Sequence, residues 1–327
     1  MIVRRTLALL AGLARPGLTR AQGRSRPIGL LMASAETDPD GQARVAAFAE
    51  ALAGLGWAEG HLLRLDRRWA AGSTALFRAH AAEMVAVAPD LLLADGTPSV
   101  AALLRETRSL PLVFVRVGDP VGSGFVESLA RPGGNATGFT AFDPLMGPKW
   151  MEFLKEAVPG LAVAGLLFNP ETAPHVGRLF LGLLERSARD LGLAAAPLPV
   201  HGEADIAAAI GDIASRPGGA LVAMPDIFLV DHRAAILAHA ARHRLPAVYT
   251  NRLFAEEGGL MSYGFPVLDA YRQAGAYADR ILRGARPADL PVQTPTNWQL
   301  TLNLRAARAL SLSLAPALLA RATEVIE

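Results

Sequence analysis

The sequence of 327 residues contains no cysteine. This absence excludes disulfide bonds, a thiol nucleophile and a cysteine-ligated zinc site. Lysine occurs only at Lys149 and Lys155, so arginine carries the remaining positive charge. No segment beyond the N-terminus reaches the about 18 uninterrupted apolar residues that a membrane-spanning helix requires. Hydrophobic residues make up 51% of the chain, and its length allows two domains, each with its own core.

The net charge of +2 depends on the N-terminal segment. Residues 1–21 carry four arginines and no acidic residue, so without them the net charge falls from +2 to −2. A body this close to neutral lacks the basic surface that nucleic-acid-binding proteins use. We therefore expect no nucleic-acid partner.

Residues 1–21 are typical of an export signal. Two arginines form a basic start, an apolar stretch covers residues 6–14, and Thr19 and Ala21 provide the small residues that a signal peptidase recognises. The apolar stretch is short and Arg15 follows it closely, so a basic tail on a cytoplasmic protein is the alternative. With cleavage near Ala21, the mature protein would lie in the periplasm.

In the rest of the chain, buried strands alternate with amphipathic helices. The expected strands are 27–33, 62–69, 91–94, 112–117, 163–168, 194–199, 220–224, 247–250, 259–264 and 298–304. The expected helices are 42–56, 74–87, 100–108, 149–158, 176–191, 204–214, 231–242 and 270–283, with a last helical stretch toward Glu327. This alternation predicts parallel sheets covered by helices on both faces. The glycine-rich segment 131–142 separates two such series, so we expect two α/β lobes.

Four polar residues stand directly before a proline, in the pairs Thr97-Pro98, Asp119-Pro120, Asp143-Pro144 and Asn169-Pro170. Three of these pairs follow an apolar run that reads as a strand. A polar cap followed by proline favours the start of a helix. Free N–H groups at such a start point toward the carboxyl edge of the sheet, where open α/β sheets bind ligands. We predict that the pairs of the two lobes face each other across a ligand-binding cleft.

Thr97 is the strongest candidate for binding an anion, because its hydroxyl and the following N–H groups suit a carboxylate. Asp119 and Asp226 are the acids that we expect to accept hydrogen bonds from a ligand ammonium. Simple helix capping is the alternative for Thr97 and Asp119, and core packing is the alternative for the aromatic candidates. The full set of expected ligand-binding residues is Ser34, Thr97, Ser99, Asp119, Phe142, Asn169, Asp226, Asn251 and Tyr263.

We expect neither a catalytic residue nor a cofactor. His239 and His243 lie one helical turn apart, but no third ligand accompanies them, so a solvated helix face is favoured over a metal site. No pairing of a nucleophile with a base emerges from the sequence either.

Several longer segments together resemble a known family. They are 128–138 (SLARPGGNATG), 258–264 (GGLMSYG), 269–284, 288–296 and 318–327. In order and spacing they resemble the ABC-transporter substrate-binding proteins of the tryptophan/tyrosine-type family, from about residue 27 to the C-terminus.

The resemblance implies the type I periplasmic-binding-protein fold, with two doubly wound parallel-sheet lobes joined by a three-strand hinge. It implies a small-molecule ligand, an ABC permease with its ATPase as partner, and a monomer. The expected division is a signal peptide over 1–21, an N-terminal lobe of 27–140 plus about 265–290, and a C-terminal lobe of 141–264 plus about 291–327.

The resemblance leaves the ligand and two other functions open. The loop 34–41 is acidic and departs from the family pattern, so a tryptophan ligand is not carried over. A ligand-sensing binding protein for a separate receptor is one alternative. An α/β enzyme using the same cleft is the other.

Overall fold

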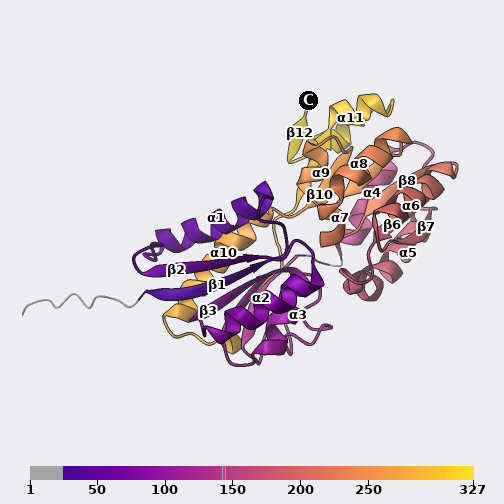
Figure 1. Ribbon diagram of the computed structural model, residues 1–327. Helices are drawn as coiled ribbons and strands as arrows, with labels where there is room; N and C mark the ends of the chain where they lie inside the picture. Colours follow the sequence, from indigo (N-terminus) through magenta and orange to yellow (C-terminus); the bar gives the residue numbers. More distant parts are fainter. Residues whose placement is uncertain (1–24, 142, 144) are drawn as a thin grey trace, which may run out of the picture.

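The computed structural model describes residues 25–141, 143 and 145–327. The predicted export signal and Phe142 lie outside the described residues. The described chain forms two α/β lobes, each with its own sheet and its own helices (Figure 1). The expected fold class, α/β with two parallel-sheet lobes, is thereby confirmed. Among the described residues, none of the helices has the length and apolar character needed to cross a membrane.

The first lobe contains a five-stranded sheet in which every pair of strands is parallel. In sheet order the strands are β2 (Leu63–Trp69), β1 (Arg26–Met32), β3 (Leu91–Asp95), β4 (Leu112–Val117) and β5 (Ala136–Thr140). Helices α1 (Pro39–Gly54) and α10 (Val267–Leu282) cover one face, and α2 (Thr74–Ala86) and α3 (Gly96–Glu106) cover the other. The inner strands β1, β3 and β4 are therefore buried on both sides, which explains their largely apolar sequences, whereas the edge strand β2 is only partly buried.

The second lobe contains a seven-stranded sheet. In sheet order the strands are β12 (Glu324–Ile326), β11 (Gln299–Asn303), β10 (Met261–Gly264), β9 (Ala247–Tyr249), β8 (Gly219–Ala223), β6 (Val163–Phe168) and β7 (Ala194–Pro199). All neighbours are parallel except β10 and β11. The helical segments are α4 (Met146–Ala157), a π-helical turn (Val176–Phe180), α5 (Leu181–Asp190), α6 (Glu203–Ser215), α7 (Ile227–Asp231), α8 (Arg233–Arg242), α9 (Arg252–Glu256), α11 (Leu304–Ala309) and α12 (Pro316–Arg321).

The chain passes between the lobes after β5, after β10 and before β11 (Figure 1). The third passage starts beside the first, because the N–H of Thr140 donates to the carbonyl oxygen of Gln293 at 2.9 Å. A short 3₁₀ turn over Pro287–Asp289 precedes it, next to β5. The second passage leads directly into α10, which returns to pack against α1 in the first lobe.

The expected helical stretch toward Glu327 is confirmed only in part, because two short helices, α11 and α12, are followed by a strand. Helix α11 ends at Ala309, and Ser311 then adopts a positive φ of 59°, which stops the helix. Pro316 begins α12, and the last residues form β12, which pairs with β11. The chain end thus covers an edge of the sheet that would otherwise be unpaired.

The polar residue before proline does not cap a helix in the way that we expected. At Asp119 no helix follows; its carboxylate accepts from the N–H of Gly122 at 2.7 Å and closes a turn. Near Thr97, helix α3 begins at Gly96, so Asp95 rather than Thr97 occupies the N-cap position. Proline fits anywhere in a first turn because the N–H groups there have no helical partner, so the pair Thr97-Pro98 marks the start of α3 without marking its cap, and the pair Asp119-Pro120 marks a turn.

Candidate ligand-binding cleft between the lobes

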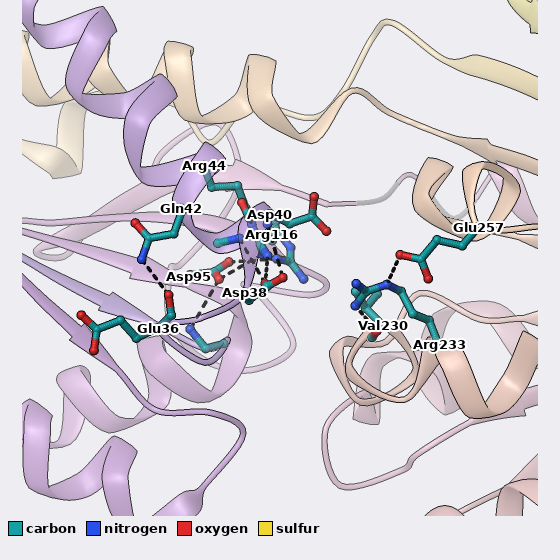
Figure 2. A network of polar contacts seen from close by, with 12 residues as sticks. Glu36, Asp38, Asp40, Gln42, Arg44, Asp95, Arg116, Val230, Arg233 and Glu257 are labelled. Atoms are coloured by element: carbon teal, nitrogen blue, oxygen red, sulfur yellow. Dashed lines mark hydrogen bonds and ion pairs between the residues drawn. The ribbon is translucent and has the colours of Figure 1, made fainter.

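A buried charged cluster lies at the carboxyl edge of the first sheet (Figure 2). Asp95 ends β3 and has no exposed surface. Its Oδ2 accepts from Arg44 Nη1 at 3.3 Å, and its Oδ1 lies 3.4 Å from Arg116 Nη1. Because this carboxylate faces the two arginines, it makes no cap hydrogen bond to α3. One acid from the sheet thus holds cations from α1 and β4.

Of the two arginines, Arg44 has more hydrogen-bond acceptors among the described residues. It donates to Asp38 Oδ2 at 3.0 Å and to the carbonyl oxygen of Asp40 at 3.0 Å, in addition to Asp95. Burial opposes its charge, but Asp95, then Tyr271 and the acids of the α1 start, outweigh burial and raise the pKa of Arg44. Asp38 also caps α1 by accepting from backbone N–H groups. The acidic loop noted in the sequence therefore neutralises a buried arginine.

The second lobe presents a carboxylate that, among the described residues, is held by neutral hydrogen-bond donors. Asp226 follows β8 and caps α7 through the N–H of Phe228 at 3.0 Å. It also accepts from the N–H of Asn169 and from the hydroxyl of Thr172, both at 2.6 Å. Burial outweighs these hydrogen bonds and raises the pKa of Asp226 to about 6.

His175 is a second buried titratable group of this lobe. Its Nε2 lies 3.0 Å from the carbonyl oxygen of Pro225, and its ring packs edge-on against Phe180. Burial, the largest influence, lowers the pKa of His175 to about 4. The ring is therefore neutral near pH 7.

Two cavities lie between the lobes and share Arg116, Val230, Asn251, Phe265 and Val267. The smaller, of about 50 Å³, also touches Thr97, Pro98, Thr172, His175 and Asp226. The larger, of about 380 Å³, extends between α1 and α10 on one side and α9, β10 and β11 on the other. Together they combine apolar surface with a few polar groups, as small-molecule sites do.

The lobes also touch each other directly beside the smaller cavity. Asp119 of the first lobe forms a 3.2 Å ion pair with Arg178 of the second. Gly118 lies against the ring of His175, so closely that a Cβ at Gly118 would stand 2.5 Å from it. The absence of a side chain at Gly118 permits this approach.

Of the predicted residues, Thr97, Asp226 and Asn251 lie together in the cavity lining. Asp119 lies next to it in the ion pair with Arg178 rather than in the lining. Asn251 also caps α9 through the N–H of Leu253.

Among the described residues, four further predicted ones lie outside both cavity linings: Ser34, Ser99, Asn169 and Tyr263. Ser99 is buried and donates to the carbonyl oxygen of Asp95, and Asn169 accepts from the N–H of Glu171. Ser34 is buried after β1, and the ring of Tyr263 packs on Phe153 and Trp298 in the core of the second lobe. For Tyr263 the structure favours the core-packing alternative.

Sequence reasoning missed Arg44, Asp95, Arg116 and His175. A charged residue inside the apolar run 112–117 was a usable signal for Arg116, because a regular buried strand has no place for it. Asp95 directly follows a buried strand and offered a similar signal. Arg44 and His175 carry no local signal, since only tertiary packing buries them.

The described residues contain no cluster of three or more His, Cys, Asp or Glu side chains arranged to bind a metal ion.

The model of the family described as ABC transporter substrate binding protein matches residues 37–326. The chain belongs to this family.

Three known proteins that are similar to this chain illustrate the family and its fold. A tyrosine-binding protein of Clostridioides difficile (strain R20291) is 24% identical over 265 residues, covering 81% of this chain and 75% of that protein. The ABC domain from Streptococcus pneumonia in complex with L-Trp has a TM-score of 0.85 at 22% identity, covering 93% of this chain and 100% of that one. A ligand-free, open substrate binding protein with adhesive properties from Clostridium difficile has a TM-score of 0.70 at 22% identity, covering 92% and 99%. At these identities the structural matches show a shared fold.

Proposed function

We propose that this substrate-binding protein is the extracytoplasmic solute-binding component of an ABC importer, and that it captures an amino acid or a related carboxylate between its lobes. The observation that carries the proposal is the convergence of Thr97, Arg116, Asp226 and Asn251, two from each lobe, on the interlobe cavities. A site divided in this way is complete only when the lobes are together.

Closure about the three passages between the lobes is the second part of the proposal. The moving units are 27–140 with about 265–290, and 141–264 with about 291–327. The contact of Gly118 with His175 and the ion pair between Asp119 and Arg178 support a closed arrangement of this chain. Ligand would shift the population toward this form.

An amphipathic amino acid suits the larger cavity. Its volume of about 380 Å³ falls within the range of small-ligand sites. Phe265 and Val267 offer apolar surface, while Arg116 and Asn251 offer polar groups. The names of two relatives, which mention tyrosine and L-Trp, point to the same class. We propose a monomer in the periplasm that delivers its ligand to a permease with its ATPase.

Thermal unfolding with a panel of the twenty amino acids and small carboxylates tests the proposal. A ligand at a hundred times its dissociation constant adds about 2.7 kcal/mol to the unfolding free energy. We expect Thr97→Ala to reduce that shift, and Thr74→Ala, in the first turn of α2, to leave it unchanged. A panel without any shift would count against amino-acid capture. Recovery of the bound compound unaltered distinguishes a binding protein from an enzyme using the same cleft.

A further inference from the structure

Arg116 interrupts a strand that is otherwise apolar. Val113 and Val115 face the core under α1 and α10. Phe114 and Val117 face the core under α2 and α3. Simple alternation would direct residue 116 into that second core. Instead the register to β5 shifts between Val115 and Val117, and Arg116 has a φ of 64°. A bulge of this kind takes one residue out of the alternation and redirects its side chain.

The bulge places a cation at the ligand cavity. A left-handed backbone is unfavourable for arginine, and strain of this kind concentrates at functional sites. The side chain of Arg116 is only 11% exposed, yet it lines both interlobe cavities. The strained backbone therefore directs the guanidinium neither into the core nor into open solvent.

The guanidinium of Arg116 has N–H groups left for a further acceptor. Within the described residues its polar contact is the 3.4 Å ion pair with Asp95, whose Oδ1 makes no hydrogen bond there. Arg44, in contrast, uses three acceptors, including the other oxygen of Asp95. A guanidinium only donates, so a buried one needs acceptors.

The first turn of α3 points at the same cavity. Asp95 stands at its N-cap without making a cap hydrogen bond, because its carboxylate faces the arginines. Gly96 and Thr97 begin the helix and line the smaller cavity. The N–H groups of a first turn and the positive end of the helix favour an anion. Two independent sets of donors thus converge on one place.

We propose that Arg116, together with the first turn of α3, binds the carboxylate of the captured solute. This inference rests on the proposed function. It states that the carboxylate end of the solute is the end that binds to the first lobe. The two oxygens of a carboxylate match the planar guanidinium. A solute that lacks the carboxylate leaves buried donors unpaired, which is how such a site rejects it.

The test compares L-tryptophan and L-tyrosine with their carboxamides by calorimetric titration. Benzoate and acetate extend the panel to carboxylates without an amine. The proteins are the wild type, Arg116→Gln and Arg116→Gly; glycine suits the positive φ at this position, so that variant removes the guanidinium without adding strain. Arg67→Gln is the matched control, because Arg67 pairs with Glu59 and lines neither cavity.

We expect the wild type to bind the amino acid at least about tenfold more tightly than its carboxamide, since a charged hydrogen bond is lost with the amide. Both Arg116 variants should lose that preference by binding the amino acid more weakly, while the carboxamide binds nearly as before. A role confined to holding Asp95 in place would change the melting temperature and leave the preference intact.

Equal binding of carboxylates and carboxamides by the wild type overturns the inference and leaves solute capture standing. The same holds if both Arg116 variants keep the wild-type preference. A wild type that binds no carboxylate also overturns it, and one that binds no probe at all, carboxamides included, counts against the proposed function as well.

Discussion

The two faces of the cleft bury a carboxylate in different ways. In the first lobe, Asp95 lies between two arginines. In the second, Asp226 is held by two backbone N–H groups and a hydroxyl. Two positive charges thus oppose the charge of Asp95, whereas the donors to Asp226 are neutral, and burial outweighs them and raises the pKa of Asp226 to about 6.

The difference assigns separate tasks to the lobes. The first lobe has a charged cluster assembled from α1, β3 and β4, so it can hold a charged end of a ligand with little rearrangement. The second lobe uses its polar groups chiefly to fix its own turns, as Asp226 does with the segment from Asn169 to Thr172. We infer that the first lobe binds first and that the second closes over the ligand.

Substitution of each carboxylate tests this difference between the lobes and has the largest expected effect on stability. Asp95→Ala leaves two buried arginines without their shared partner, and we expect it to lower the unfolding free energy by about 3–5 kcal/mol. Asp226→Ala loses a cap and two further hydrogen bonds but also removes a poorly compensated charge, so we expect about 1–3 kcal/mol. Urea denaturation measures both. An equal or larger loss for Asp226→Ala would contradict the contrast.

The pH dependence of stability separates the contributions of two buried groups of the second lobe, Asp226 and His175. The pKa of Asp226 is raised to about 6, so its contribution to stability is full below the unfolded value of 3.8 and is lost as the pH rises through 6. The pKa of His175 is lowered to about 4, so its contribution is full above the unfolded value of 6.5 and is lost as the pH falls through 4. Each amounts to about 3 kcal/mol, and the two oppose each other.

Burial also raises the pKa of Asp231, at the end of α7, to about 6, so Asp231 contributes in the same direction as Asp226. We therefore expect the unfolding free energy of the wild type to fall as the pH rises from about 4 to 6.5. In Asp226→Asn the fall should be smaller, because His175 then opposes Asp231 alone, and in His175→Gln it should be steeper. Urea denaturation at half-unit pH steps checks both slopes, and a slope in Asp226→Asn as negative as that of the wild type would refute this account.

The alternation of strands and helices was readable from the sequence because buried parallel strands give continuous apolar runs. The place of the cleft was readable as well, since Thr97, Asp226 and Asn251 follow strand ends and line it. The charged cluster was not, because Arg44 comes from a helix and meets Asp95 only in three dimensions. The turn at Asp119 was misread as a helix start, since its local pattern is the same in both cases.

The contact between Gly118 and His175 gives the smallest and most specific prediction. A Cβ at Gly118 would stand 2.5 Å from the ring of His175, which is itself held by Pro225 and packed on Phe180. The ring cannot simply turn away, so Gly118→Ala should keep the lobes slightly apart. We expect the best-bound amino acid of the panel to bind about tenfold more weakly, a loss of about 1.4 kcal/mol.

The matched control is Gly134→Ala, in the same lobe, where a Cβ meets open space. It should leave the affinity unchanged. Small-angle scattering with saturating ligand should show a larger radius of gyration for Gly118→Ala than for the control. Urea denaturation should give similar unfolding free energies for the two variants, because the added methyl group meets the other lobe rather than the core of its own lobe. Unchanged affinity and scattering in Gly118→Ala would mean that ligand binding does not need this contact, and the second lobe would then close by another path.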